Sequence, residues 1–230
     1  MNERRRQWLE AIRSMTATAS DAESYLDRRL QFTTSIAQKL TDGCGKQDAL
    51  LYGVWLDEHI APIYIGQSTE GRRRLWDLPI GESHHLANSF PPEIWSRVVV
   101  VYWEELFATF PAKARGKIEN AVRESLTAAS SNVTGAIGLG LEYLMQRAVQ
   151  PLFNRRKKLR DGSWRNVDWE SSSSVGAKAA PSVQSLFAIV LLKWEELAQH
   201  PPSADVTQVA GGRVVFPSRI SDISSIGGRE

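Results

Sequence analysis

The chain has 230 residues, of which 42% are hydrophobic and eight are tryptophan, and its formal net charge is +2. This apolar content can fill the core of one compact unit, and so mild a charge neither requires nor excludes a nucleic-acid partner. The single cysteine, Cys44, excludes an intrachain disulfide and a zinc cage built from cysteines, which favours a cytoplasmic location. The longest apolar runs, residues 98–103 and 186–192, are far shorter than the roughly 20 residues of a membrane-spanning helix, so we expect no membrane partner.

The first half of the chain predicts two helices, then a pair of strands. Apolar residues recur at helical spacing in residues 2–15 and 21–40. After a glycine-containing break, residues 50–56 and 60–65 have the composition of two strands joined by a tight connection. An arginine-rich helix is then expected over residues 71–78.

The second half predicts one more strand and further helices. The apolar run at residues 97–103 suits a buried strand. Helical patterns cover residues 112–128 and 139–149, and a polar loop at residues 130–138 separates them. An amphipathic helix follows at about residues 182–199, and its apolar side is expected to pack into the core or, alternatively, to form a dimer face.

These elements predict an α+β fold in which a small antiparallel sheet of three strands is flanked by helices. Residues 1–45 form N-terminal helices, residues 46–160 form the core and residues 161–230 form a C-terminal extension, all in one compact unit. Within the extension, a hairpin is expected at residues 210–212, and the residues after it are expected to be frayed.

Two tyrosines of the predicted strand pair invite a geometric prediction. Tyr52 and Tyr64 are twelve positions apart. If the connection between the strands has an odd number of residues, Tyr52 lies opposite Tyr64 and both phenols project from one face of the sheet. A connection with an even number of residues would place the two phenols on different faces.

Several residues of this chain follow one another in a distinctive order. A strand tyrosine is followed by Tyr-Ile-Gly on the next strand, by an arginine ten residues after the second tyrosine, and then by a helical glutamate, a proline and an asparagine. These residues are Tyr52, Tyr64, Ile65, Gly66, Arg74, Glu142, Pro151 and Asn154. Their order and spacing resemble those of the GIY-YIG nuclease family, and the resemblance covers residues 50–154.

Two alternatives stay open within this resemblance. The first motif reads Leu-Leu-Tyr rather than Gly-Ile-Tyr, and a shifted alignment would place Gly53, Val54 and Trp55 there instead, although a tryptophan could not serve as a base. Glu119, with Asn132 downstream, imitates the layout of the acidic motif but lacks the proline, so Glu142 is preferred.

The resemblance implies a role for each residue. Tyr52 would act as the general base or help position it, which requires its pKa of about 10 to fall. Arg74 could supply the cation that lowers this pKa, and its guanidinium is suited to grip the scissile phosphate. Glu142 would hold Mg²⁺, for which Mn²⁺ would substitute. Tyr64 would bond to the phosphate or the water, and Asn154 would orient backbone and phosphate groups.

Further residues are candidates for proton relay and for DNA contact. His84 or His85, in the loop after the arginine-rich helix, would relay a proton near the nucleophile. Phosphate contacts are expected from basic residues beside the site, namely Arg72, Arg73, Arg155, Arg156, Lys157 and Lys158. A solvated protein surface is the alternative explanation for these charges.

The resemblance therefore predicts a metal-dependent endonuclease acting on double-stranded DNA, most readily a sequence-specific type II restriction enzyme. Such an enzyme would cut both strands as a homodimer or by binding twice, and a companion methyltransferase acting on the same site would protect host DNA. One alternative is a repair or mobile-element nuclease that recognises DNA structure or modification. Another is a catalytically inactive DNA-binding protein on the same scaffold.

Overall fold

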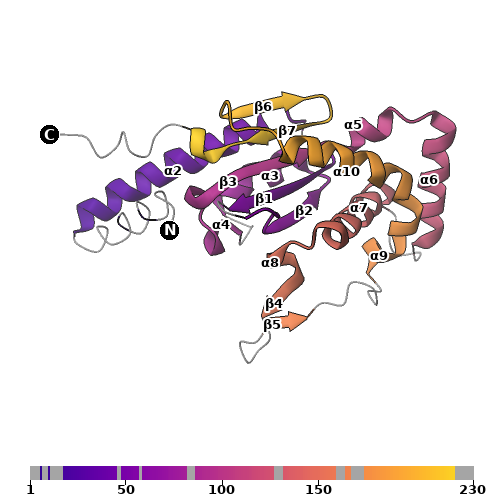
Figure 1. Cartoon of the computed structure of the whole chain (residues 1–230), viewed down its shortest axis with the longest axis horizontal. Coiled ribbons are helices and arrows are strands. Elements are labelled where there is room, and N and C mark those ends of the chain that lie inside the picture. Colours follow the sequence, from indigo (N-terminus) through magenta and orange to yellow (C-terminus); the bar gives the residue numbers. More distant parts are fainter. Residues whose placement is uncertain are drawn as a thin grey trace.

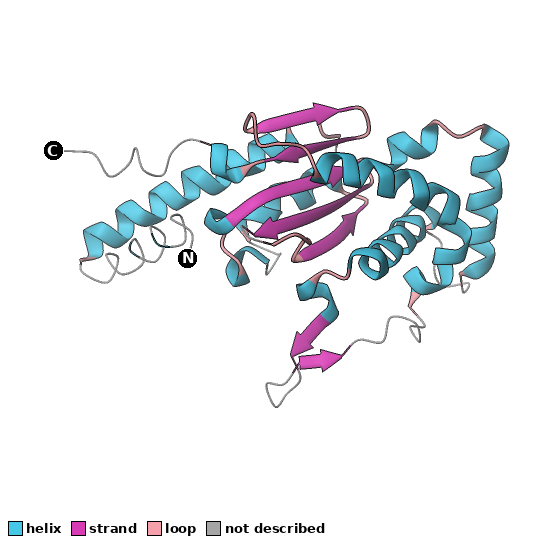
Figure 2. Cartoon of the chain, in the orientation of Figure 1, coloured by secondary structure: helices cyan, strands magenta, loops and turns pink. Residues whose placement is uncertain are grey.

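The computed structural model describes residues 6, 10, 18–45, 48–56, 59–81, 86–126, 132–158, 164–166 and 174–220. The fold is α+β, as the sequence predicts, and it is built on an antiparallel sheet surrounded by helices (Figure 2). Five strands lie in the order β2-β1-β3-β7-β6. Their bounds are β1 (Leu50–Leu56), β2 (Tyr64–Ser68), β3 (Trp95–Val101), β6 (Val206–Val209) and β7 (Gly212–Val215).

The prediction of a three-stranded sheet is wrong, because the C-terminal extension adds two strands. The hairpin expected at residues 210–212 is present, with Gly211 in the left-handed region at φ +79°. Its second strand, β7, pairs with β3 from Val98↔Val215 to Val101↔Gly212. The pairing depends on the free edge of β3, more than a hundred residues earlier, so no local pattern in the hairpin could reveal it.

Helices from the N-terminal half cover one face of the sheet. These are α2 (Ala19–Thr41), α3 (Gly71–Ile80), the short α4 (Leu86–Ser89) and the 3-10 turn η1 (Pro92–Ile94). The core on this side includes Leu50, Tyr52, Val54, Val98, Val100 and Val215, packed against residues such as Phe32, Ile36 and Leu75. Even-numbered residues of β1 and β3 therefore face α2 and α3, as the alternation of a strand requires.

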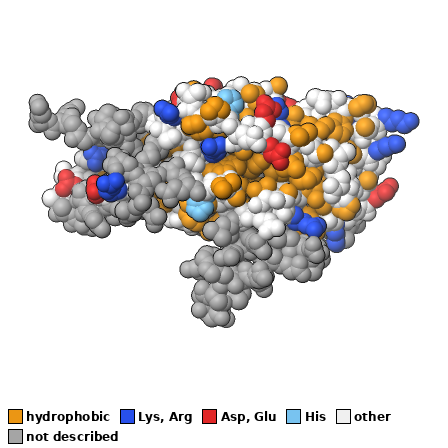
Figure 3. All heavy atoms as spheres, viewed as in Figure 1, with side chains coloured by type: hydrophobic (Ala, Val, Ile, Leu, Met, Phe, Trp, Pro, Cys, Tyr) orange, Lys and Arg blue, Asp and Glu red, His pale blue; other side chains and the backbone are white. Residues whose placement is uncertain are grey.

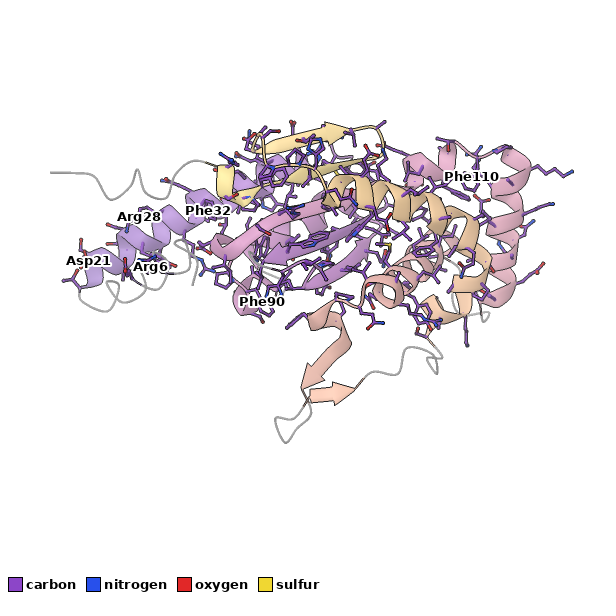
Figure 4. The ribbon with its side chains drawn as sticks, viewed as in Figure 1. Arg6, Asp21, Arg28, Phe32, Phe90 and Phe110 are labelled. Carbon is purple, nitrogen blue, oxygen red and sulfur yellow. The ribbon has the colours of Figure 1, made fainter. Side chains whose placement is uncertain are left out.

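The second face is covered by the remaining helices. They are α5 (Trp103–Ala108), α6 (Ala112–Ser125), α7 (Val133–Val149), α9 (Val175–Ala179), the 3-10 turn η2 (Ala180–Val183) and α10 (Gln184–Ala198). Leu51, Ile65, Val99 and Val214 meet these helices in a second core. Figure 4 labels one residue that packs in each core, Phe32 on α2 to the left of the sheet and Phe110 after α5 to its right. A last 3-10 turn, η3 (Pro217–Arg219), follows β7.

Several predicted boundaries are confirmed and others are wrong, among them the strand predicted over 97–103, which is β3 at Trp95–Val101. Residues 50–56 form β1 as predicted, and the helix predicted over 21–40 is α2, which the Thr18 side chain caps at the Asp21 N–H. The second strand begins at Tyr64 rather than residue 60, because Ile60 is fully exposed and Pro62 lacks an N–H for strand pairing. The helix predicted over 2–15 falls almost entirely outside the described residues.

Helix α7 begins at Val133, whereas the sequence predicts a loop up to residue 138. The Asn132 side chain accepts a hydrogen bond from the Gly135 N–H at 2.8 Å and so caps the helix. Gly138, at the end of the predicted loop, and Gly140, in the predicted helix, are packing residues within α7. A Cβ at Gly138 would lie 2.7 Å from Gln67 Oε1, and one at Gly140 would lie 3.1 Å from Val183.

The amphipathic helix predicted over 182–199 is α10, and its apolar side packs into the core as expected. Leu186, Val190 and Trp194 are buried, whereas Ile189 and Leu192 on the outer side are exposed. Figure 3 shows apolar side chains gathered on the face of the molecule where α10 lies. The helical run from Val175 to Ala198 is long and apolar enough to span a membrane by length and composition alone, a test that core helices of folded proteins also pass.

A second, two-stranded sheet lies apart from the first. After α7, the short α8 (Leu152–Arg155) leads directly into β4 (Arg156–Lys158), which pairs antiparallel with β5 (Trp164–Asn166). Figure 1 shows this pair projecting from the body of the molecule below α8. We call β4 and β5 together the ribbon.

Candidate active site

Tyr52 and Tyr64 lie on one face of the sheet, which is the arrangement expected for a connection of odd length, but they are not directly opposite. The connection from β1 to β2, residues 57–63, is odd in length, and the register pairs Tyr52 with Gly66 and Val54 with Tyr64. The tyrosines are therefore diagonal neighbours, with ring centroids 6.0 Å apart and ring planes inclined at 37°. Their hydroxyls are hydrogen-bonded to each other.

Gly66 makes room for this pair of phenols. A Cβ at Gly66 would lie 2.6 Å from Tyr52 Oη and 2.9 Å from Tyr64 Cε1. The Tyr52 phenol therefore lies across the Gly66 backbone, in space that any side chain at this position would occupy. The glycine of the Tyr-Ile-Gly sequence thus has a physical role at the site, which is to let a buried phenol cross β2.

Arg74 enters the same region from the inward side of α3. It is half-buried, and its positive charge opposes the rise that burial causes in the pKa values of Tyr52, Tyr64 and Glu142. In the described part of the chain the Arg74 guanidinium makes no ion pair within 4.0 Å and no side-chain hydrogen bond. Its donors are therefore available for an anionic ligand beside the two phenols and the carboxylate.

Glu142 reaches the site from α7, which packs against β2 (Figure 1). Its Oε1 accepts a hydrogen bond of 2.8 Å from Nε2 of Gln146, one helical turn later. The same Gln146 nitrogen lies 3.3 Å from the Ile65 carbonyl, so the amide ties the carboxylate to the edge strand. Burial raises the pKa of Glu142 to about 7, while the Gln146 hydrogen bond and the Arg74 charge act in the opposite direction.

Asn154 is attached to β2 through the backbone of Ile65. Its Oδ1 accepts from the Ile65 N–H at 2.7 Å and its Nδ2 donates to the Ile65 carbonyl at 2.8 Å. The Phe153 N–H donates to the Ile63 carbonyl, and the Phe153 ring packs between Tyr64 and Phe90. The start of α8 therefore lies along the free edge of β2, where a further strand would otherwise pair.

The pKa of Tyr52 is raised in the folded protein without a bound metal ion, whereas the role of general base requires it to fall. Burial is the largest influence and raises the Tyr52 pKa well above 10, against the opposing charge of Arg74. Tyr52 is only 1% exposed, whereas Tyr64 is partly exposed. Burial and the negative charge of Glu142 raise the pKa of Tyr64 as well, although the hydrogen bond with Tyr52 lowers it. Both tyrosines are therefore protonated at neutral pH.

The residues of the two alternative assignments, Glu119 and Trp55, lie away from this site. Glu119 is on α6, which packs against α7 and η2 at the end of the molecule away from β2, and Asn132 is the cap of α7 (Figure 1). Trp55 faces the opposite side of the sheet, where its ring lies 5.4 Å from that of Trp194. Neither Glu119 nor Trp55 shares the region of Tyr52 and Arg74.

The other predicted site residues are placed as follows. Arg72 and Arg73 are exposed on the outer side of α3, and Arg73 is ion-paired with Glu70 at 3.0 Å. The backbone of Arg155 ends α8, and Arg156, Lys157 and Lys158 form β4. His84 and His85 lie outside the described residues. Sequence reasoning missed Gln146, although its position four residues after Glu142 on one helix was a usable signal.

Glu142 fits a hard cation by the chemistry of its donors. One carboxylate oxygen is occupied by Gln146, and within the described residues the other accepts no hydrogen bond. Among those residues Glu142 is not part of a cluster of three or more His, Cys, Asp or Glu side chains. One carboxylate with waters and phosphate oxygens is a ligand set that Mg²⁺ accepts.

The site as a whole combines two neutral phenols, a guanidinium without an acceptor among the described residues and one carboxylate, all at the edge of β2. These groups can bind an anion, hold a cation next to it and donate or accept hydrogen bonds at a water between them. Comparisons with protein-family models, with curated proteins and with solved structures find no match to this chain.

Proposed function

We propose that this chain is a metal-dependent endonuclease of the GIY-YIG type that hydrolyses phosphodiester bonds of double-stranded DNA. One observation carries the proposal. Tyr52, Tyr64, Arg74 and Glu142 come from two strands and two helices, yet Arg74 acts electrostatically on the other three. A chance resemblance in the sequence gives no reason for these four side chains to lie close enough for Arg74 to act on the other three.

Arg74 would bind the scissile phosphate. Its guanidinium has no acceptor among the described residues, and its planar donors match two phosphate oxygens. The phosphate would then lie close to Glu142, and the charge of Arg74 would offset the increasing negative charge as the attacking oxygen bonds to phosphorus. Half-burial strengthens this interaction relative to an exposed arginine, because less water screens it.

The family resemblance assigns to Tyr52 the role of general base or of positioning it. We assign the contact with the water and the positioning to different tyrosines. Tyr64 is the phenol with exposed surface, so we assign the contact with the attacking water to it. Tyr52 is buried and hydrogen-bonded to Tyr64, and we assign it the positioning of that phenol. The division is supported by the difference in exposure and by Gly66, which lets the Tyr52 phenol reach its neighbour.

Glu142 would hold Mg²⁺ through the oxygen that Gln146 leaves free. The bound ion would neutralise phosphate charge and make the attacking water more acidic. Without a cation the carboxylate has a pKa of about 7, so at neutral pH a cation competes with a proton for this oxygen. Asn154 holds the edge of β2 that carries Tyr64, through both backbone groups of Ile65.

Within this activity we propose a sequence-specific type II restriction enzyme, acting in the cytoplasm as a homodimer or by binding its site twice. A nuclease directed to branched or modified DNA is the alternative, and the products of cleavage distinguish the two. Discrete fragments from several plasmids would support sequence recognition. Cleavage confined to branched or modified substrates would support the alternative.

The test is incubation of purified protein with mixed plasmid DNA in Mg²⁺ and in EDTA, with the fragments resolved on a gel. Wild type and Glu142→Ala are compared, and Glu119→Ala is the matched control because it removes the rival carboxylate. We expect cleavage by wild type and Glu119→Ala in Mg²⁺ only, and none by Glu142→Ala. If Glu142→Ala cuts as well as wild type, or if no substrate, branched or modified DNA included, is cut, the proposed function is wrong.

A further inference from the structure

The ribbon is a part of the described chain that contributes no residue to the proposed site. It begins immediately after Asn154 and Arg155, and the Asn154 side chain is bound to Ile65 at the site. Its main contacts are between its own strands and with α8, and Figure 1 shows it extending away from the helices and the large sheet. An isolated two-stranded hairpin is marginally stable in water, so a bound partner would stabilise the ribbon.

The sequence of the ribbon indicates the charge of that partner. The strands read Arg-Lys-Lys and Trp-Arg-Asn, and Arg155 precedes them, with no acidic residue in either strand. Lys157 and Arg165 are register partners and therefore share one face of the ribbon. Four of the six residues of the two strands are basic, and a polyanion would complement this charge.

The second face carries a different set of residues. Arg156 is paired with Asn166 and Lys158 with Trp164, so these four share that face. Arginine and asparagine are residue types that make paired hydrogen bonds to guanine and adenine in the major groove. A two-stranded β-ribbon also has the width that the major groove of B-form DNA accepts.

We propose that the ribbon lies in the major groove of the DNA that the site cuts, with Lys157 and Arg165 on phosphates and the Arg156 and Asn166 face on base edges. The inference rests on the proposed function, because the DNA held at Arg74 and Glu142 is the duplex that the ribbon would enter. The continuity from Asn154 through α8 to β4 places the groove contact beside the scissile phosphate.

The experiment measures binding of the full chain in EDTA to a labelled DNA duplex of random sequence at several salt concentrations. Lys157→Gln with Arg165→Gln is compared with Lys113→Gln and Lys117→Gln, which removes two charges from α6. The ribbon variant should bind roughly tenfold more weakly, and its salt slope should fall by about two, because two phosphates would no longer be neutralised. The α6 variant should bind like wild type, and an equal weakening in the two variants would overturn the proposal.

A second measurement tests the groove. Methylation of guanine N7 modifies the major-groove edge, so premethylated duplex should bind wild type more weakly. Changing Arg156 and Asn166 to alanine should remove this sensitivity. Wild-type binding that is unaffected by the methylation would overturn the proposal. Binding of double-stranded RNA as tightly as DNA would also overturn it, because the major groove of RNA is too narrow for a ribbon.

The failure of this inference and the failure of the proposed function give different results. If plasmid is cut in Mg²⁺ but the ribbon variants bind like wild type, the ribbon proposal is wrong and the nuclease stands. If the ribbon variants lose DNA binding but no substrate is cut, the ribbon proposal stands and the chain is a DNA-binding protein on this scaffold.

Discussion

Asn154 pairs with both backbone groups of Ile65, at 2.7 Å and 2.8 Å, although the two residues are 89 positions apart. The side-chain amide thereby takes the place of a neighbouring strand at the edge of β2. Ile65 lies between Tyr64 and Gly66, so the contact fixes the strand segment that supports both phenols. Asn154 is thus a structural clamp on the site, whatever contact it also makes with DNA.

Replacing Asn154 should release this strand edge in a graded way. Asn154→Ala removes both hydrogen bonds and should destabilise the fold by about 1–3 kcal/mol. Asn154→Asp keeps an acceptor for the Ile65 N–H but places a negative charge against the Ile65 carbonyl. Amide hydrogen exchange at Ile65 separates the two effects, with fast exchange expected in the alanine variant and retained protection in the aspartate variant. Equal protection in all three proteins would show that the clamp is unimportant.

Glu142→Gln should stabilise the protein at alkaline pH in the absence of divalent cations. The folded pKa of Glu142, about 7, is above its ordinary value of 4.5. The protonated form is therefore favoured by folding, and stability is lost as pH rises from the ordinary value through the folded one. At about pH 8 the gain from Glu142→Gln should be roughly 1–3 kcal/mol, and near pH 4.5 it should almost vanish.

Urea unfolding of both proteins in EDTA at the two pH values measures this difference. Added Mg²⁺ supplies the control, because it should stabilise wild type and leave Glu142→Gln unchanged. A glutamine variant that is less stable than wild type at alkaline pH in EDTA would contradict the burial of an uncompensated carboxylate.

The sequence predicted those features of the fold that depend on nearby residues. The helical spacing of apolar residues in α2 is local, and so is the rule that a connection of odd length puts Tyr52 and Tyr64 on one face. The register between β1 and β2 was not predictable, because the composition of the sequence starts the second strand at Ile60, whereas β2 begins four residues later, at Tyr64. The placement of β7 beside β3 and of Asn154 beside Ile65 depends on distant partners. For Asn154, only the family resemblance pointed to a role.

Gln146→Leu should weaken cation binding at Glu142 without abolishing the fold. Leucine is similar in volume but cannot donate to the carboxylate or to the Ile65 carbonyl. Loss of a hydrogen-bonding partner behind a metal ligand typically reduces metal affinity about 10–100-fold. The Mg²⁺ concentration for half-maximal cleavage should therefore rise about tenfold, with most of the rate restored at saturation.

The matched control for this variant is Gln184→Leu, an exposed glutamine at the start of α10. It should leave the Mg²⁺ requirement unchanged. A merely structural role for Gln146 would lower the rate at every Mg²⁺ concentration. That pattern would contradict the role of Gln146 in positioning the Glu142 carboxylate.

Gly66→Ala should disturb both the fold and the site, because the new methyl group needs space that the phenols occupy. Its Cβ would be 2.6 Å from Tyr52 Oη and 2.9 Å from Tyr64 Cε1, so at least one ring must move. Overpacking of this kind costs about 1–3 kcal/mol, and the displaced Tyr64 phenol should reduce cleavage further. Gly116→Ala is the opposite case, since nothing lies within 4 Å of its Cβ in the middle of α6.

The free energy of unfolding of Gly116→Ala should rise by about 0.5–1 kcal/mol, the ordinary advantage of alanine over glycine in a helix. Thermal unfolding and cleavage rates of the two variants then test one geometric claim. Tyr52 reaches Tyr64 only across a residue without a side chain. An alanine at position 66 that leaves stability and cleavage intact would mean that the two phenols do not need to meet there, and the division of roles between Tyr52 and Tyr64 would lose its support.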